Sequence, residues 1–418
     1  MKHIVIVGGG FTGVTAAVDL AKARLSEVKI TLVTPRSYFD YYPGLFHLLT
    51  GFSVRQLAIP YEYIFERTGI VHEKTEVTSV NLDKKYICTG KDTEIHFDYL
   101  VLAPGSVTNY FDMEEFKDRL HTVTTVDDVL ELRRSIHEML TISHFDQSKS
   151  SPGGEVIVIG GGPNGTESAA EVAILVKQVA DAYQIDPTTV HTSLYVSGDR
   201  VTPMFDQKVS DILHKKLVSL GVDVVYNKRV TPDEMKNVLM PDVASKNRLV
   251  IWSTGMKLAP LASQLTGFQK DKRGKIMVDE YLRAKLDDGA VIDSVFVGGD
   301  LACTEYSGLA QTAHYDGHAI ARNIYAHIRG EALQKNKPKN LGYIIAMGRD
   351  WSIFIKGTSH ICGKLIWYMR RLVDLKSYLQ ILSLRKALAI FMSEHETWEE
   401  FDASARQHME EKYQKKSS

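Results

Sequence analysis

The sequence predicts an α/β fold with two similar strand–turn–helix–strand units, followed by a C-terminal segment of amphipathic helix. Two observations predict the units: apolar strands at Ile4–Val7 and Val156–Ile159 each run directly into a glycine-rich turn. A third observation predicts the C-terminal helix: after residue 364 the leucines are spaced as on one face of a helix. A chain of 418 residues is longer than one typical domain, so a division into several units is expected.

The first unit continues through a helix over about 13–25 and a strand over 28–33. Its turn reads Gly8-Gly9-Gly10-Phe11-Thr12-Gly13. Such a turn between a strand and a helix is typical of dinucleotide binding. Gly8 permits the tight bend, Gly10 lets a pyrophosphate approach the backbone, and Gly13 allows the helix to pack against the strand. The helix N-terminus adds unpaired N–H groups and partial positive charge.

The second unit repeats every element of the first. Its strand leads into the turn Gly160-Gly161-Gly162-Pro163-Asn164-Gly165, an alanine-rich helix and a strand at Thr192–Val196. One such motif can be a glycine-rich turn in an ordinary α/β fold, but two correctly placed copies disfavour that alternative. Two dinucleotides in one chain indicate electron transfer between cofactors. Polar joints are expected at 147–154 and 334–340.

A third feature follows the apolar strand Val295–Val297, which ends in Gly298-Gly299-Asp300. Taken alone, this is a strand-to-turn junction with an Asx turn. A carboxylate beside a glycine backbone can also contact a ligand closely. Gly299 and Asp300 therefore indicate a ligand site only in combination with the two turns.

The composition excludes several other classes of function. Fifty basic residues against 51 acidic ones give a formal charge of −1, which argues against a dedicated nucleic-acid binder. The three cysteines, Cys88, Cys303 and Cys362, are too few and too scattered for a disulfide framework, a zinc site or a C-x-x-C redox pair. We therefore expect a reduced, intracellular enzyme without a metal site.

Together these features resemble the two-dinucleotide-binding-domain flavoproteins, and within them the type II NADH dehydrogenases (NADH:quinone oxidoreductases). The matching stretches are Ile4–Gly13, Tyr41–Leu45 with Thr50-Gly51, Asp98–Ser106, Gly160–Glu167, Val250–Gly255, and Phe296–Ala302 with Ala310–Ala313. They cover residues 1 to about 330 in the family's order. The resemblance implies two Rossmann-like domains in a glutathione-reductase-like arrangement. The implied units are an FAD-binding domain in two parts, 1–115 and 265–340, an NAD(P)H-binding domain, 116–264, and a membrane-association segment, 341–418.

The resemblance also implies roles for single residues. For FAD it implies Gly8, Gly10, Phe11, Thr12, Gly13, Thr34, Pro43, Ala103, Gly105, Gly299 and Asp300. For NADH or NADPH it implies Gly160, Gly162, Pro163, Asn164, Gly165 and Gly255. The implied catalytic residues are Glu167 near the nicotinamide, and Gln311 and Tyr315 at a quinone. His314, beside Gln311, is a possible proton donor, although a lone histidine is more often structural.

Two positions depart from the family's pattern. An acidic residue usually ends the second strand of each unit and binds ribose hydroxyls, but here Thr34 follows the first strand and Val196 stands in the second. Without the second carboxylate a 2′-phosphate is not rejected, and Arg200 lies near enough to favour one. Tyr315 replaces the glutamine expected at the quinone site, and its phenol can also donate to a carbonyl. The preference between NADH and NADPH therefore stays open.

The C-terminal segment is basic and amphipathic. Its apolar stripe consists of Leu365, Met369, Leu372, Leu375, Leu379 and Leu382. Residues 364–386 contain six basic residues against Asp374 alone, a net charge of +5. A helix packed on the core or at a dimer interface is one interpretation, and attachment to a membrane surface is the favoured one. We expect a homodimer on the cytoplasmic face of the membrane, with no helix that spans it.

Other functions of related folds remain as alternatives. A sulfide:quinone oxidoreductase needs a pair of cysteines facing the flavin, and no cysteine lies between 89 and 302. A flavoprotein of the apoptosis-inducing-factor type would use its nucleotide-dependent state to regulate a partner. A protein without flavin would be a degenerate scaffold. The favoured prediction is two-electron transfer from NAD(P)H through FAD to a membrane quinone, without proton pumping.

Overall fold

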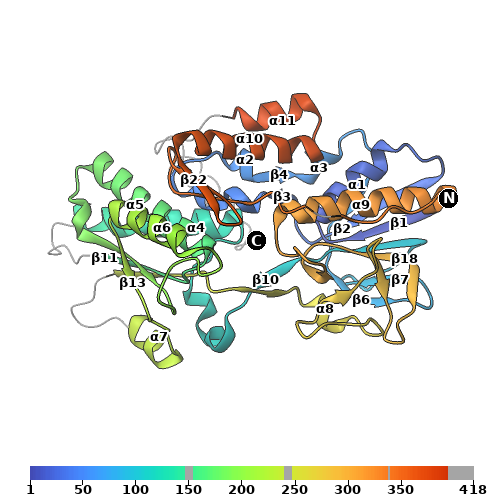
Figure 1. Cartoon of the computed structure of the whole chain (residues 1–418), viewed down its shortest axis with the longest axis horizontal. Helices are drawn as coiled ribbons and strands as arrows, with labels where there is room; N and C mark the ends of the chain where they lie inside the picture. The colour runs from blue at the N-terminus through green and yellow to red at the C-terminus, as the bar shows by residue number, and fades with distance from the viewer. Residues whose placement is uncertain (146–153, 240–246, 338, 394–418) are drawn as a thin grey trace, which may run out of the picture.

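The structure is a computed structural model, and it describes residues 1–145, 154–239, 247–337 and 339–393. Most of the predicted joint at 147–154 and the charged tail at 394–418 lie outside these residues. Figure 1 shows an elongated molecule with one sheet toward each end and the C-terminal helices lying along one long side.

The N-terminal lobe contains a six-stranded sheet in the order β17-β18-β9-β1-β2-β5. Its strands are β17 (Arg283–Lys285), β18 (Val291–Val297), β9 (Tyr99–Leu102), β1 (Lys2–Val7), β2 (Val28–Val33) and β5 (Val71–Glu73). All neighbours are parallel except β17 and β18. The central strands are apolar on both faces because both faces are covered, as expected for a parallel sheet.

Two layers cover this sheet. Ile4 and Ile6 belong to the same core as helices α1 (Phe11–Lys22) and α9 (Ala310–Arg329). Val5 and Val7 point to the other face, where they share a core with strands of a small antiparallel sheet. That sheet consists of β6 (Val77–Asn81), β7 (Tyr86–Thr89) and β8 (Glu94–His96). The alternation of side chains along β1 therefore supplies both cores.

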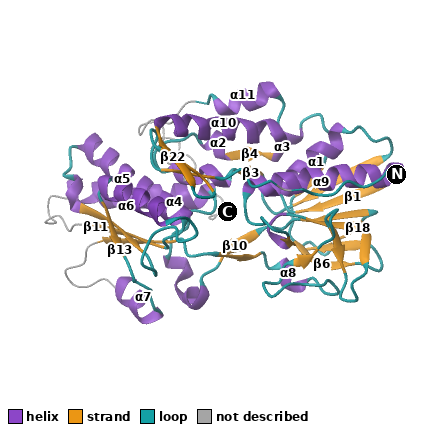
Figure 2. Ribbon diagram, in the orientation of Figure 1, coloured by secondary structure: helices purple, strands orange, loops and turns teal. Residues whose placement is uncertain are grey.

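The second lobe is built on a four-stranded parallel sheet in the order β13-β12-β11-β14. Its strands are β13 (Val222–Val225), β12 (Val190–Tyr195), β11 (Gly154–Ile159) and β14 (Asn247–Trp252). Its helices are α4 (Val126–Phe145), α5 (Pro163–Tyr183), α6 (Gln207–Ser219) and α7 (Pro232–Leu239). Figure 2 shows α4, α5 and α6 on one side of this sheet and α7 on the other. The α/β class and its two Rossmann-like units are confirmed.

The chain passes between the lobes along β10 (Ser106–Thr108) and β15 (Met256–Leu258), which pair antiparallel (Figure 1). After β10, the 3-10 helix η2 (Phe111–Arg119) packs Met113 and Phe116 against the second lobe. After β15, the short helix α8 (Leu261–Gln264) returns to the core of the first. The domain boundaries at 115 and 264 remain predictions.

The C-terminal segment forms an antiparallel sheet and a helical hairpin. Its elements are β20 (Tyr343–Ala346), β21 (Ser352–Lys356), β22 (Ser359–Gly363), α10 (Lys364–Ile381) and α11 (Leu384–Phe391). The hairpin covers an excursion of the first lobe made of β3 (Tyr38–Asp40), η1 (Tyr42–Leu48), α2 (Val54–Leu57), β4 (Ala58–Pro60) and α3 (Tyr61–Phe65) (Figure 1). Across the described ranges, no helix has the length and apolar character needed to cross a bilayer.

Helix α10 has a partly exposed apolar stripe and a polar face that is buried. Leu365 is 80% exposed and Leu372 is 62% exposed, so much of the predicted apolar stripe faces outward. Arg370 and Asp374 are buried instead. Of the six basic residues counted in this stretch, Arg370 lies in the interior, where it forms an ion pair with the buried Asp374.

Candidate functional site

The two glycine-rich turns have the same backbone geometry. In the first, the Gly8 amide donates to the Val33 carbonyl at 3.0 Å. In the second, the Gly160 amide donates to the Tyr195 carbonyl at 3.0 Å. Gly8 and Gly160 have φ angles of +107° and +128°, which favour glycine. Each turn thus leaves the carboxyl end of its strand in the same way.

Both turns lie where parallel α/β sheets bind ligands. β1 is flanked by β2 on one side and β9 on the other, and β11 is flanked by β12 and β14. In each sheet the chain crosses first to one side of the central strand and later to the other. The crevice at the carboxyl ends of strands at such a switch point is the general ligand site of open α/β sheets.

The glycines within each turn divide into two kinds. A Cβ on Gly13 would lie 1.9 Å from the Gly8 carbonyl oxygen, and a Cβ on Gly165 would lie 1.9 Å from that of Gly160. These two glycines therefore permit the helix to pack on the turn. A Cβ on Gly10 or Gly162 would meet nothing within 4 Å, so this side of each turn is open to a ligand.

The N-termini of α1 and α5 also suit a pyrophosphate. Gly10 and Gly162 are their N-cap residues, and neither helix has a side chain that accepts a hydrogen bond from its first amides. Pro163 occupies the first turn of α5. Uncapped N–H groups and the helix dipole attract phosphate oxygens. The residues present therefore fit a dinucleotide at each turn.

Three separate segments meet at the first turn. The Ala103 amide donates to the Val7 carbonyl at 2.9 Å, and a Cβ on Gly8 would lie 2.0 Å from the Ala103 oxygen. A Cβ on Gly299 would lie 2.9 Å from Thr12 Oγ1. The structure thus brings together residues predicted from distant stretches.

The Asp300 carboxylate is oriented within this cluster by its neighbours. Ser106 Oγ donates to Asp300 Oδ2 at 2.6 Å. The amide of the preceding residue, Gly299, donates to Asp316 Oδ2 at 3.0 Å. Burial raises the pKa of Asp316 to about 6, against its hydrogen bonds from Gly299 and Asn336. Ser106 and Asp316 were not predicted, since sequence gives no sign of which side chain supports a turn.

Aromatic rings form another wall beside the first turn. Phe11 contacts Tyr41 and Tyr42, with ring centroids 5.9 and 6.4 Å apart, and also His314 at 4.8 Å. Burial raises the pKa of Tyr42 to about 12, with a smaller contribution from nearby carboxylates that include Asp40 and Asp300. The segment around Pro43 therefore lies next to the predicted FAD turn.

The positions expected to carry ribose-binding carboxylates correspond in the two lobes. Thr34 lies beside Gly9 and Val196 beside Gly161, because a Cβ on either glycine would clash with that neighbour. The loop carrying Arg200 touches the second turn through the Thr202 amide, which donates to the Gly161 carbonyl at 2.6 Å. Arg200 itself donates to two neutral acceptors, on Gln207 and Pro203.

Gly105 and Gly255 lie in the two chain segments that connect the lobes, directly before β10 and β15. Gly105 has φ +74° and accepts a hydrogen bond from the Ala259 amide at 3.0 Å. Gly255 has φ +154° and accepts from the Asn109 amide at 3.0 Å. Both residues therefore stabilise the β10–β15 connection. Asn164 is exposed at the start of α5.

Glu167 lies in the first turns of α5 and is buried. Its Oε1 accepts the Ala346 amide of β20 at 2.9 Å. Burial raises the pKa of Glu167 to about 8, although the Ala346 amide and the nearby Arg370 act in the opposite direction. A buried carboxyl that titrates near neutral pH is suited to hold or release a proton.

Glu171, one helical turn further on, was not predicted. It is fully buried and accepts hydrogen bonds from His47 Nδ1 at 3.0 Å and from the Gly348 amide at 2.8 Å. Thr50 Oγ1 donates to its other oxygen at 2.5 Å. Glu167 and Glu171 therefore attach the second lobe to the first lobe and to the C-terminal sheet.

The predicted quinone residues lie at the start of α9. Gln311 and Tyr315 are four residues apart and so share one face of that helix. Both are half-buried, and Gln311 Nε2 donates to the Lys339 carbonyl at 3.2 Å. His314 points elsewhere: its Nδ1 bonds Thr15 Oγ1 at 2.7 Å, and burial lowers its pKa to about 3. A neutral, buried imidazole is a poor proton donor.

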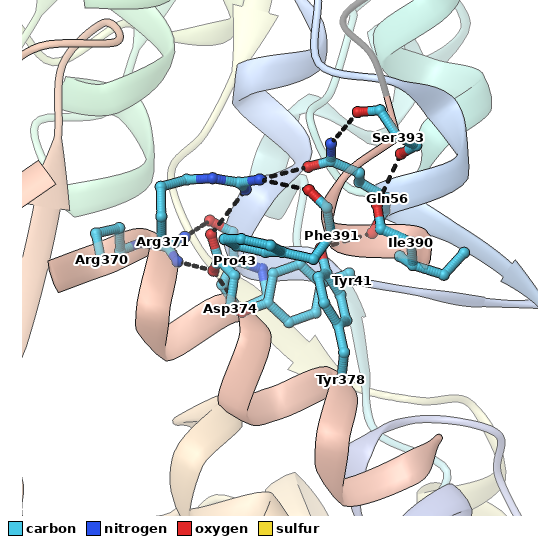
Figure 3. Close-up of polar contacts among 10 residues, drawn as sticks. All are labelled: Tyr41, Pro43, Gln56, Arg370, Arg371, Asp374, Tyr378, Ile390, Phe391 and Ser393. Atoms are coloured by element: carbon cyan, nitrogen blue, oxygen red, sulfur yellow. Dashed lines mark hydrogen bonds and ion pairs between the residues drawn. The ribbon is translucent and has the colours of Figure 1, made fainter. Parts of the chain in front are cut away.

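A polar cluster from the C-terminal hairpin reaches the wall of the first turn (Figure 3). Tyr41 donates to Asp374 at 2.6 Å, and Arg370 donates to Asp374 and to the Pro43 carbonyl. Sequence analysis missed this cluster. The signal available was Asp374, the single acid within a basic stretch, four residues after Arg370.

The cysteines lie in three different small sheets. Cys88 is in β7, Cys303 in β19 (Ala302–Cys303) and Cys362 in β22. Cys303 Sγ contacts Asp271 at 3.7 Å, and burial, with Asp271, raises its pKa. A thiol with a raised pKa is a weaker nucleophile. This arrangement gives no support to the cysteine chemistry of a sulfide oxidoreductase.

Comparison with known proteins extends these observations. The chain is 23% identical over 393 residues to the type II NADH:quinone oxidoreductase of Staphylococcus aureus, covering 91% of this chain and 96% of that protein. NDH2 from Plasmodium falciparum, solved with NADH, has a TM-score of 0.78 at 18% identity, with 94% and 97% covered. The sulfide:quinone oxidoreductase of Aquifex aeolicus has a TM-score of 0.70 at 17% identity, with 94% and 96% covered.

The resemblance found in the sequence is confirmed by these relatives. A model of the family described as pyridine nucleotide-disulphide oxidoreductase matches residues 2–317, which include both glycine-rich turns and the Asp300 region. This chain belongs to the pyridine nucleotide-disulphide oxidoreductase family.

Proposed function

We propose that this protein transfers two electrons from NADH or NADPH, through FAD bound at the first turn, to a quinone. The observation that carries the proposal is the pair of equivalent turns, each open at its middle glycine, Gly10 or Gly162. Bound FAD supplies the redox chemistry, since it can accept a hydride and release electrons to a second acceptor. The names of the relatives support NADH as the donor and a quinone as the acceptor.

The protein's own contribution is orientation and proton handling. The first turn, Asp300 and the segment around Pro43 hold the flavin, and the second turn and Gly255 hold the nucleotide. Productive alignment of two bound molecules removes much of the entropic cost of their reaction. Glu167 lies on α5 just after the second turn, is mostly protonated at pH 7 because burial raises its pKa, and can donate a proton to a reduced acceptor.

The acceptor site is assigned to the face of α9 that carries Gln311 and Tyr315. Both side chains can donate a hydrogen bond to a carbonyl oxygen, which is the polar group of a quinone. Their half-buried position at the helix N-terminus leaves them reachable from outside the lobe. His314 has no role in this proposal because it faces Thr15 and Phe11.

One experiment tests the donor and the acceptor together. The visible spectrum of the purified protein is recorded, NADH or NADPH is added without oxygen, and a water-soluble quinone analogue follows. We expect an oxidised flavin spectrum that one nucleotide bleaches and the quinone restores. Protein without flavin, or reduced flavin that the quinone leaves bleached, would contradict the proposal.

The hairpin α10–α11 supports attachment to the surface of a membrane. Its outward apolar side chains include Leu365, Tyr368, Leu372, Val373, Leu379, Leu384 and Met392, each at least 39% exposed. Three cations, Lys364, Lys376 and Arg385, are exposed on the same hairpin. An apolar face bordered by cations suits an anionic lipid surface, from which a lipid-soluble quinone can enter.

Sedimentation with anionic phospholipid vesicles tests this attachment. The double variant Leu365→Glu/Leu372→Glu should stay in the supernatant, because two charges replace apolar side chains at the contact. Val218→Glu is the matched control, since Val218 is 53% exposed on α6 of the other lobe. Equal sedimentation of the wild-type protein and the double variant would contradict membrane attachment by this face.

A further inference from the structure

The buried face of α10 is unusually polar. Its buried side chains are Ile366, Arg370, Asp374, Tyr378 and Ile381, spaced by four or three residues along one side of the helix. Arg370 is 5% exposed and Asp374 is 2% exposed. Burying charges is costly unless each has a close partner, so this face requires an explanation beyond the packing of apolar surface.

Asp374 has three donors, which together satisfy both carboxylate oxygens. Arg370 Nη1 and Tyr41 Oη donate to Oδ1, the latter at 2.6 Å, and Arg371 Nη1 donates to Oδ2 at 3.2 Å (Figure 3). Burial lowers the pKa of Arg370 and Asp374 raises it, with a net increase. The Arg370 guanidinium therefore stays charged beside the Asp374 carboxylate.

The same guanidinium groups contact the first lobe at two further points. Arg370 donates to the Pro43 carbonyl, and Arg371 donates to Gln56 Oε1 at 2.9 Å. Tyr378 donates to the Gln56 carbonyl at 2.9 Å. Figure 3 shows these side chains converging between α10 and the segment that contains Tyr41 and Pro43. These bonds are directional, so they orient the segment more strictly than apolar contacts alone.

The segment they hold reaches the predicted flavin site directly. Tyr41 packs against Phe11, the first residue of α1 after the turn, and Tyr378 packs against Tyr41 with ring centroids 5.0 Å apart. Two side-chain contacts thus connect α10 with the first glycine-rich turn. On the opposite side of α10, Leu372 and Leu379 are exposed.

We propose that Asp374 is a positioning residue for the oxidoreductase site. Through Tyr41 and Arg370 it orients the segment Tyr41–Gly44 against the flavin. This inference rests on the proposed function, because it requires FAD at the first turn. The two faces of α10 then have separate roles, with the leucine face contacting lipid and the charged face orienting the flavin wall.

The test compares Asp374→Asn and Tyr41→Phe with Lys215→Gln, an exposed change on α6 of the other lobe. Turnover is measured per bound flavin with NADH or NADPH and a water-soluble quinone, without membranes. We expect Asp374→Asn to lower kcat about ten- to a hundredfold, since a misplacement of 1 Å can cost about 10²-fold. The absorption maxima of the bound flavin should shift, and sedimentation with vesicles should not change.

Tyr41→Phe removes one hydroxyl and keeps the ring, so it carries the test if Asp374→Asn does not fold. It should lower kcat per flavin in the same direction by a smaller factor, and Lys215→Gln should match the wild-type protein. A lowered melting temperature with unchanged turnover per flavin and an unchanged spectrum would overturn the inference, because the cluster would then be only structural. Wild-type protein without flavin would overturn the proposed function itself.

Discussion

The two glycine-rich turns share one backbone design but differ in what surrounds them. Phe11 and Thr12 of the first turn are buried, whereas Pro163 and Asn164, at the same places in the second, are half-buried and exposed. The first turn is also enclosed by aromatic rings and by the Asp300 region, while the second opens beside the loop of Arg200. The difference fits a first coenzyme that stays bound and a second that exchanges in every cycle.

The largest effect that would test this difference is expected from Gly162→Val. A Cβ at Gly162 meets nothing within 4 Å, and its φ of −75° suits any residue, so the variant should fold. Its side chain would occupy the space of a pyrophosphate. We expect kcat/KM for the nucleotide to fall by about 10²-fold or more, with flavin still bound.

Steady-state kinetics and the flavin spectrum together measure this result. The matched change Gly10→Val in the first turn should instead give protein without flavin, because Gly10 is equally open. Full nucleotide oxidation by Gly162→Val would contradict the assignment of the second turn.

A smaller effect is expected from Asp300→Ala. The change removes the carboxylate that accepts from Ser106 Oγ and leaves that hydroxyl without this partner. Hydrogen bonds to charged groups contribute about 1.5–3 kcal/mol, so flavin affinity should fall about ten- to a hundredfold. The measurement is the ratio of flavin to protein after gel filtration.

Asp293→Asn is the control for this variant, because Asp293 is an exposed carboxylate on β18, the strand that precedes Asp300. Equal flavin content in Asp300→Ala and the wild-type protein would show that the first turn retains its coenzyme without this residue.

The smallest effect concerns the proton at Glu167, on α5 just after the second turn. With a pKa of about 8, the wild-type carboxyl loses its proton as pH rises from 7 to 9, so the rate of quinone reduction should fall over that range. In Glu167→Gln the profile should be flat across it. Rates measured at saturating nucleotide check the prediction, and an identical profile in both proteins would contradict it.

The same carboxyl affects stability. Its pKa is about 8 in the folded protein, above its ordinary value of 4.5, so its contribution to stability is fully present below pH 4.5 and is lost as pH rises through 8. Glu167→Gln should therefore gain melting temperature relative to the wild-type protein between pH 5 and pH 9. Thermal unfolding at the two pH values measures this difference.

Much of the fold could be predicted because its signals are local. The strand at 4–7 and the turn that follows it lie within ten residues, and the strand predicted at 28–33 coincides with β2. The helix predicted over 13–25 is α1, which begins two residues earlier, at Phe11. Each of these elements depends on side-chain types that recur at short spacing.

The orientation of α10 could not be predicted in the same way. Leucine spacing identifies an apolar stripe, but it does not reveal which face packs against the protein. That choice depends on Tyr41 and Gln56, which lie more than 300 positions away in the sequence. Asp374 and Arg370 at a spacing of four residues were the only local sign of an inward charged face.

The orientation of α10, with its charged face inward and its leucines outward, has a practical consequence for handling the protein. Ending the chain before Lys364 would remove the exposed apolar side chains of α10 and α11, which is one route to a preparation free of detergent. It would also remove the hydrogen-bond partners of Tyr41 and Gln56 on α10 and expose the segment beside the proposed flavin site. Replacing the outward leucines with polar residues, on a chain of full length, is therefore the better route to a soluble and active sample.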